Sequence, residues 1–211
     1  MSQKGILAVI SGFSGVGKGT VMKTLLSQHD EYALSISATT RQPRTGEENG
    51  REYFFKTREE FEEMIAQNQL LEHACYCGNY YGTPRPYVEQ MLGEGKNVLL
   101  EIEIQGAMNI RKQFPDAVLI FIMPPSGEEL AARLMGRGTE TEDVVKARLQ
   151  RAAQEAEGIE DYDYIFVNDT PEACAQRIDD LIRSQRFRTG NNLDFIEKIR
   201  SEVTRFRADN E

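Results

Sequence analysis

Residues 12–20 have the types and the spacing that bind the phosphates of a nucleotide. They read Gly-Phe-Ser-Gly-Val-Gly-Lys-Gly-Thr, which matches the P-loop pattern G-x-x-x-x-G-K. Glycines allow backbone angles that other residues resist, so successive N–H groups can turn toward an anion. Lys18 adds a mobile cation for the outer phosphates. The pattern predicts a nucleoside triphosphate site lined by Gly12, Phe13, Ser14, Gly15, Val16, Gly17, Lys18, Gly19 and Thr20.

The elements on either side of this loop are those that would position it. The apolar run 6–10 is typical of a buried strand, and a helical pattern follows at 19–28. The unpaired donors at the N-terminus of that helix would point at the same anion. The alternative is a glycine-rich strand-to-helix turn with a solvated lysine, and both flanks weigh against it.

Further along the chain, apolar runs alternate with helical patterns. The runs 98–102, 117–122 and 164–167 resemble 6–10 in being apolar throughout, as strands buried on both faces are, and a weaker run lies at 33–36. Strands that alternate with helices predict an α/β fold with a doubly wound parallel sheet. The remaining helices are expected at 85–93, 105–113, 126–136, 140–157 and 171–186.

Residues 37–83 interrupt this alternation. Turn-forming residues fill 38–47, and a helix is predicted after them by the capping box of Thr57 and Glu60. Tyrosines and glycines then crowd residues 76–82. We interpret 37–83 as a small insert of short strands and one helix beside a nucleotide-binding core of residues 1–36 and 84–188.

The last segment, residues 189–211, is set apart by a break at Thr-Gly-Asn-Asn. After it, Ile196, Ile199, Val203 and Phe206 follow one another at spacings of three, four and three, which predicts an amphipathic helix over 193–206. Its apolar face could pack on its own domain or on a second subunit in a homodimer. We favour packing on its own domain.

The composition of the chain limits which binding partners and which cellular compartment we expect. The chain has 211 residues, 40% hydrophobic and 28% charged, with a net charge of −9. This charge argues against a nucleic-acid partner, and no apolar run approaches the roughly 18 residues that a membrane helix needs. Its 3 cysteines, an odd number, predict a reducing, cytoplasmic setting. Cys75 and Cys77 are spaced too closely for a zinc site.

The rest of the sequence narrows the class of enzyme. No asparagine is followed by lysine, as the guanine motif of a GTPase would require, and motor ATPases are normally larger. A small phosphotransferase remains. In the insert, Arg41 and Arg44 could clamp a phosphate with paired donors, and Glu72 could accept the two adjacent donors of guanine. An exposed basic loop and a surface carboxylate remain equal alternatives on the residues alone.

Together, these residues resemble the guanylate kinase family from about residue 5 to 186. The resemblance is carried by Ser-Ala-Thr-Thr-Arg-Gln-Pro-Arg from Ser37, Gly-Asn-Tyr-Tyr-Gly from Gly78, Glu-Ile-Gln-Gly-Ala from Glu103, Arg-Leu-Met-Gly-Arg-Gly-Thr from Arg133 and Val-Asn-Asp from Val167. It implies phosphoryl transfer from ATP to GMP with Mg²⁺ as the cofactor. It also implies that the phosphate of GMP is held by Ser37, Arg41, Arg44, Tyr53 and Tyr81. Glu72 and Thr83 would then read guanine, helped by Glu101 or Glu103.

The sequence departs from the family pattern at two places in this site. Many relatives have aspartate where this chain has Glu101 and Glu103, which leaves open which of the two contacts guanine and which orients a magnesium-bound water. Gly19 replaces the serine or threonine that often binds Mg²⁺, and Thr20 follows it. We therefore expect Mg²⁺ to be held indirectly, through water and phosphates.

The resemblance also implies a helical lid over about 133–151. Arg133 and Arg137 are four apart on one predicted helix that Gly138 would end, and the capping box of Thr139 and Glu142 would begin the next. Arg137 and Arg148 would close over the triphosphate and, with Lys18 and Arg44, form the catalytic set. Asn168 and Asp169 would contact adenine. A helical hairpin with solvated charges is the alternative that the residues alone favour.

Two other functions compete with this one. Some scaffold proteins carry guanylate-kinase-like domains that bind partner proteins and no longer catalyse, but those domains typically lose the intact P-loop that this chain keeps. A kinase of AMP or UMP is the second alternative. Glu72 and Thr83 weigh against it, because a site that pairs buried polar groups rejects a mismatched base.

Overall fold

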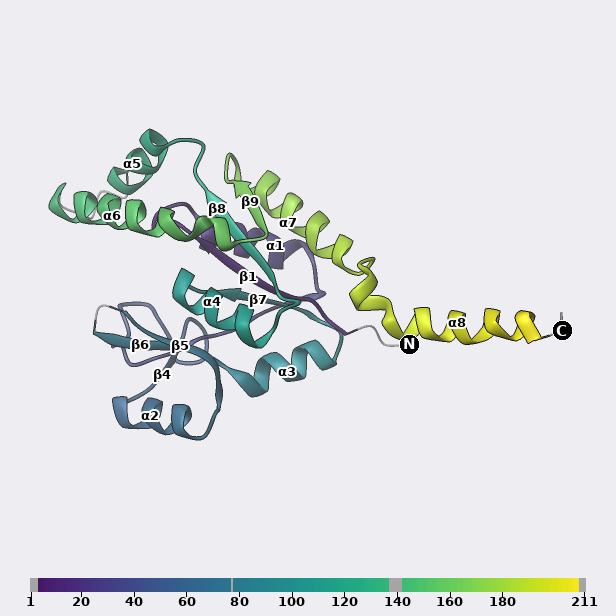
Figure 1. The fold of residues 1–211 in the computed structure, drawn as a ribbon. Coiled ribbons are helices and arrows are strands. Elements are labelled where there is room, and N and C mark those ends of the chain that lie inside the picture. The colour runs from purple at the N-terminus through teal and green to yellow at the C-terminus, as the bar shows by residue number, and fades with distance from the viewer. Residues whose placement is uncertain (1–3, 77, 137–141, 209–211) are drawn as a thin grey trace.

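A five-stranded parallel sheet forms the centre of the molecule (Figure 1). The computed structural model describes residues 4–76, 78–136 and 142–208. The strand order is β2-β7-β1-β8-β9. The strands are β1 (Leu7–Gly12), β2 (Tyr32–Leu34), β7 (Asn97–Glu101), β8 (Val118–Met123) and β9 (Tyr164–Val167). All pairs are parallel, so the carboxyl ends of β1, β7, β8 and β9 lie at one edge.

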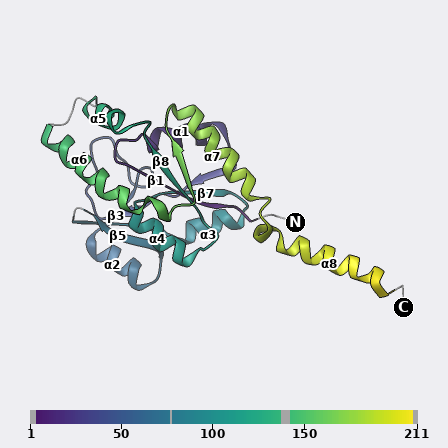
Figure 2. The ribbon, with the colours of Figure 1, turned by 45° about the horizontal axis from the view of Figure 1, so that its top comes forward.

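Helices cover both faces of this sheet, as a doubly wound fold requires. The helices α1 (Lys18–Gln28) and α7 (Pro171–Gln185) pack together on one face, and α3 (Arg85–Gly93) and α4 (Ile104–Gln113) lie on the other (Figures 1 and 2). Side chains of β1, β7 and β8 are buried between them, for instance Val9, Leu99 and Ile120. The predicted α/β fold with a doubly wound parallel sheet is therefore confirmed.

The strand β9 differs from the sequence prediction in its burial. We expected 164–167 to be buried on both faces, but β9 is the edge strand of the sheet. Tyr164, Ile165 and Val167 keep 38%, 53% and 41% of their surface exposed. β2, at the other edge, is largely buried, so the edge position alone does not explain the difference. The prediction was wrong because an apolar run shows that a strand can be buried, whereas the elements packed on its two faces decide whether it is.

A second, four-stranded sheet lies beside the first, with the order β4-β3-β6-β5. It contains β3 (Ala38–Thr39), β4 (Phe54–Phe55), β5 (Leu70–Tyr76) and β6 (Asn79–Pro84). One helix, α2 (Arg58–Ala66), begins at the predicted capping box of Thr57 and Glu60. Ala38, Phe61 and Leu70 form a small hydrophobic core of its own. The short strands and single helix predicted for the insert are thus present.

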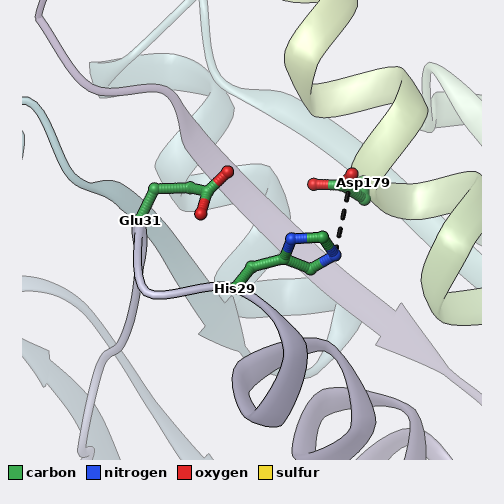
Figure 3. A group of neighbouring side chains, drawn as sticks. All are labelled: His29, Glu31 and Asp179. Atoms are coloured by element: carbon green, nitrogen blue, oxygen red, sulfur yellow. Dashed lines mark ion pairs between the residues drawn. The ribbon is translucent and has the colours of Figure 1, made fainter.

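The contact between α1 and α7 is fixed by a polar cluster in which His29, Glu31 and Asp179 meet (Figure 3). Asp179 is buried and accepts a 2.7 Å hydrogen bond from the hydroxyl of Tyr32. Arg183 lies between the two carboxylates, with Nε 2.8 Å from Asp179 and a terminal nitrogen 3.0 Å from Glu31. The guanidinium already pairs with both carboxylates, so we interpret the cluster as a structural clamp and not as a metal centre.

Two helices follow β8. The first, α5 (Gly127–Met135), is capped by the hydroxyl of Ser126, and the second is α6 (Glu142–Glu155) with a 3-10 turn after it, η1 (Ala156–Asp161). We expected Gly138 to end the first helix, but α5 already ends at Met135 with Gly136 as its C-cap. Arg137, Gly138 and Thr139 lie outside the described residues, and so does Cys77.

The C-terminal helix α8 (Leu193–Ala208) projects away from the rest of the protein (Figures 1 and 2). It follows a short 3-10 turn, η2 (Thr189–Asn192), where the break was predicted. Our preference for packing on its own domain was wrong, because Ile199 and Val203 on the predicted apolar face remain 40% and 54% exposed. Among the described helices, none is both long and apolar enough to cross a membrane.

Candidate functional site

The P-loop lies at the carboxyl edge of the large sheet, between β1 and α1. Gly15 and Gly17 have φ angles of 86° and 95°, a left-handed conformation that strongly favours glycine. Their surroundings exclude side chains as well, because a Cβ on Gly15 would lie 2.5 Å from Leu134 and one on Gly17 would lie 2.8 Å from Asn168. The loop therefore depends on its glycines for both conformation and space.

Lys18 curls back over this loop. Its Nζ donates to the main-chain oxygens of Gly12, at 2.6 Å, and Phe13, at 3.4 Å. Within the described part of the chain, carbonyl groups thus hold the ammonium group at the mouth of the loop, and a phosphate could replace them. Ser14 is half-buried beside it, and Gly19 and Thr20 are exposed at the start of α1.

Two side chains that are distant in sequence, one after β9 and one in α5, hold the main-chain oxygen of Val16. The side-chain amide of Asn168 donates to this oxygen at 2.8 Å, and the guanidinium of Arg133 donates to it at 3.2 Å. Arg133 also donates to the main-chain oxygen of Asn168 at 3.0 Å. Asn168 is buried, and its side chain supports the P-loop. Its contact with adenine stays a prediction. Asp169 is exposed and pairs with Arg177 at 2.7 Å, a partner that the sequence did not indicate.

Three of the predicted phosphate ligands lie together on the small sheet. The guanidinium of Arg41 lies over the ring of Tyr53, 5.2 Å from its centre, and that ring meets Tyr81 edge-on at 6.1 Å. Glu47 binds Arg41 at 2.9 Å and holds it in this position, and this ion pair raises the pKa of Arg41. Sequence reasoning missed Glu47, although it stands in the same loop.

The two other predicted phosphate ligands flank this group. Arg44 is exposed, and its main-chain N–H donates to Glu47 at 2.7 Å. Ser37 is half-buried just before β3, where its main-chain oxygen accepts from Phe54. The carboxylate of Glu47 therefore organises the loop from both ends, through the Arg41 side chain and the Arg44 backbone.

Glu72 and Thr83 form a buried pair on neighbouring strands. The hydroxyl of Thr83 donates to Oε1 of Glu72 at 2.7 Å. Thr83 is 0% exposed and Glu72 is 6% exposed. Burial raises the pKa of Glu72 to about 7, although the hydrogen bonds from Thr83 act in the opposite direction. A buried carboxylate costs free energy unless it meets donors. The surface charge that we kept as an alternative for Glu72 is therefore excluded.

Glu101 and Glu103 lie on different elements. β7 ends at Glu101, while Glu103 is the N-cap of α4. Their charges act on different groups. Burial raises the pKa of Tyr53 and the charge of Glu101 raises it further, whereas Glu103 adds to the raised pKa of buried Tyr162. Glu101 is therefore the one of the two whose charge acts on the small sheet.

The lid arginines are described only in part. Arg133 lies in α5 and reaches the P-loop as given above. Arg148 lies half-buried in α6, while Arg137 falls outside the described residues. The described part of the lid thus contacts the P-loop through Arg133.

Comparison with known proteins agrees with this geometry. The guanylate kinase family model matches residues 4–185. The guanylate kinases of Bacillus subtilis (strain 168) and Lactococcus lactis subsp. lactis (strain IL1403) are 51% and 48% identical over 189 and 188 residues, which cover 89% of this chain and 93% and 92% of theirs. A crystal structure of guanylate kinase from Anaplasma phagocytophilum matches with a TM-score of 0.74 at 36% identity, covering 89% of each chain. Since the matched residues 4–185 contain both sheets and the P-loop, the chain belongs to the guanylate kinase family.

Proposed function

We propose how the residues of this chain carry out the reaction of its family, in which ATP and GMP give ADP and GDP. The chain is a nucleoside monophosphate kinase, and such a reaction needs a donor site and an acceptor site that face each other. The observation that carries our assignment is the pairing of an intact P-loop, for ATP, with a buried carboxylate, Glu72, on a separate small sheet, for GMP. A binding module would need neither feature.

In the donor half, the P-loop N–H groups and the N-terminus of α1 bind the phosphates of ATP. Lys18 exchanges the oxygens of Gly12 and Phe13 for phosphate oxygens, which are better partners for an ammonium group because they carry charge. Arg133 and Asn168 keep Val16, and with it the loop, in place during this exchange. Asp169 remains a candidate for contact with adenine.

In the acceptor half, the phosphate of GMP is held by Ser37, Arg41, Arg44, Tyr53 and Tyr81. Two features support this. The side chain of Arg44 is exposed, and the hydroxyls of Tyr53 and Tyr81 stand on rings that Arg41 has already ordered. Glu47 keeps Arg41 oriented, so that less conformational entropy is lost when the phosphate arrives.

Guanine is read by Glu72 and Thr83. Guanine presents its ring N–H and its amino group side by side, and one carboxylate can accept from both. Adenine presents no such pair, so binding it would leave the buried carboxylate without donors. We assign Glu101 to the guanine side of the site as well, because its charge acts on Tyr53 of the small sheet.

Mg²⁺ fits the carboxyl edge of the large sheet, where carboxylate and hydroxyl oxygens lie beside the P-loop. Thr20 is exposed there, and Glu103 begins α4 at the same edge. Oxygen ligands and water suit Mg²⁺, and we propose that Thr20 and Glu103 contact it indirectly, through water. When bound, the ion would neutralise charge on the phosphates of ATP.

In the transfer step, a phosphate oxygen of GMP attacks the γ-phosphorus of ATP in line. The new P–O bond forms as the bond to the bridging oxygen of ADP breaks, and no covalent enzyme intermediate is needed. The transition state is loose, with charge spread over its equatorial oxygens. Lys18, Arg44, Arg137 and Arg148 neutralise that charge, and closure of the insert (residues 37–83) and the lid (about 133–151) over the core excludes water.

The exposed face of α8 supports a homodimer. An antiparallel pair of these helices would place the apolar side chains of Ile196, Ile199, Val203 and Phe206 of the two copies against one another. The pairing would therefore bury these apolar side chains. We propose that a second copy of the chain covers this face.

The assay that tests the catalytic proposal uses the purified protein with ATP, Mg²⁺ and each nucleoside monophosphate in turn. ADP should form with GMP and scarcely with AMP, UMP or CMP. ADP formation with another base would keep the fold and the mechanism but overturn the role of Glu72. A folded protein that binds ATP and is inactive with all four would point to a binding module.

A further inference from the structure

We infer that Gly106, in the first turn of α4, positions the carboxylate of Glu72 for guanine. The reason is the space that a residue without a side chain leaves beside the carboxylate. The inference rests on the role proposed above for Glu72. It adds a specificity-determining residue that does not itself contact the nucleotide.

The two oxygens of Glu72 have different neighbours. Oε1 accepts the hydrogen bond of Thr83 at 2.7 Å. Oε2 lies over Gly106, where a Cβ would stand 2.6 Å from that oxygen and 3.2 Å from the carboxylate carbon. Cβ contacts shorter than 3.0 Å essentially never occur, so the carboxylate occupies the volume that any side chain at 106 would need.

The backbone gives no other reason for glycine at this position. Gly106 lies inside α4 and does not have a positive φ, so an L side chain could adopt its conformation. Alanine would also be the better helix former. The close approach of Glu72 is therefore the feature that requires glycine here.

Neither α4 nor β5 can easily move apart to accept a side chain. Ala107 and Ile110 of α4 are buried in the main core. At the other end of the helix, the amide of Gln113 donates to the main-chain oxygen of Leu71 at 2.5 Å, and Arg85 bonds both Gln113 and the oxygen of Leu70. Because Leu71 adjoins Glu72, this clamp fixes the distance between the helix and the carboxylate. The side chain of Glu72 is then the part that must give way.

The first experiment is Gly106→Ala, assayed with GMP and with ATP as the varied substrate. The displaced carboxylate should lose its alignment with the two guanine donors, so we expect KM for GMP to rise about tenfold or more, and the preference for GMP over AMP to fall. KM for ATP should stay within about twofold, since the P-loop is untouched. An unchanged KM for GMP would overturn the inference.

Gly93→Ala is the matched control. Gly93 also lies in a helix, at the end of α3, and a Cβ there would meet no atom within 4 Å. This variant has the same gain in helix propensity without the contact. It should leave both KM values as they are in the parent, and an equal rise of KM in both variants would mean that the effect has nothing to do with Glu72.

A double-mutant cycle with Glu72→Ala separates this inference from the proposed function. In the Glu72→Ala background Gly106→Ala should change KM for GMP no further, because no carboxylate is left to displace. An equal rise in both backgrounds would overturn the inference while the role of Glu72 survives. If Glu72→Ala by itself left selection for GMP unchanged, the proposed function of Glu72 would fail.

The midpoint of urea unfolding gives a second measure of the contact that does not depend on activity. Gly106→Ala should lower the midpoint when Glu72 is present and should not lower it in the Glu72→Ala background. If Gly106→Ala proved too unstable to assay, recovery of folding in the double variant would still support the contact. A fall of the midpoint by the same amount in both backgrounds would contradict the contact between Glu72 and position 106.

Discussion

The side-chain amide of Asn168 donates a 2.8 Å hydrogen bond to the main-chain oxygen of Val16, although 152 positions separate the two residues. This bond joins the end of β9 to the P-loop. Because Asn168 is buried, the bond is shielded from water, and Arg133 supplies the second donor to the same oxygen.

Asn168→Ala should therefore loosen the P-loop. We expect the free energy of unfolding to fall by about 1 kcal/mol, since the oxygen of Val16 loses one of its two donors. KM for ATP should rise while KM for GMP changes little, which steady-state assays with each substrate varied would reveal. Asp180→Ala is the matched control, because Asp180 is exposed on α7 and lies outside the predicted site. A lower free energy of unfolding with an unchanged KM for ATP would argue against a role of Asn168 in holding the P-loop for ATP.

Binding of GMP should depend on pH through Glu72. Burial raises the pKa of this carboxyl group to about 7, and only the ionised form can accept both guanine donors. KM for GMP should thus rise about tenfold from pH 8 to pH 6, where about nine-tenths of the groups are protonated. The phosphate of GMP titrates in the same range, so Glu72→Gln serves as the control and should retain only that smaller dependence. Equal profiles for the two proteins would contradict the role of Glu72.

The same buried group should lower the stability of the free protein at alkaline pH. The pKa of Glu72 is about 7 when folded and 4.5 otherwise, so folding favours the protonated form. The contribution is fully present below pH 4.5 and is lost as the pH rises through 7. Glu72→Gln should then be as stable as the parent at pH 4 and up to about 3 kcal/mol more stable at pH 8. Urea unfolding at the two pH values would measure this, and a destabilised Gln variant at pH 8 would refute it.

Arg44→Met should reduce turnover severely and leave binding of ATP nearly intact. Arg44 is exposed beside the phosphate-binding cluster, and one well-placed arginine contributes about 10³-fold to phosphoryl transfer. Turnover would be followed as ADP formation and ATP binding by titration calorimetry. Arg200→Met, on the distant helix α8, is the matched control. Near-normal turnover of Arg44→Met would remove this residue from the catalytic set.

A charge on the apolar face of α8 should abolish the proposed dimer. Ile199→Glu places a carboxylate in the middle of the antiparallel pair, where burying it would cost more than the pairing gains. Sedimentation velocity should then show a monomer where the parent is a dimer. Ser201→Glu, on the opposite side of the same helix, should leave the mass unchanged. A parent protein that is monomeric at all concentrations would exclude this assembly.

Local residue patterns were enough to predict the main elements. The P-loop, the alternation of strands with helices, the capping box at Thr57 and the break before α8 are all present as expected. Each depends on residues close together in the chain, through backbone angles, hydrogen-bond caps or the periodicity of apolar side chains. Arg41, Arg44 and Glu72 could also be identified from the sequence as candidate site residues, although the residues that surround them could not.

Contacts between distant segments were decided only by the tertiary structure. The exposure of β9 depends on what packs on its faces, and α8 projects away from the rest of the protein (Figure 1). Asn168 became a support of the P-loop because β9 ends beside it. The raised pKa of Glu72 and its place over Gly106 likewise result from packing β5 against α4. The sequence by itself thus determined which chemical groups the protein has, while burial and neighbours that only the fold brings together decided how those groups behave.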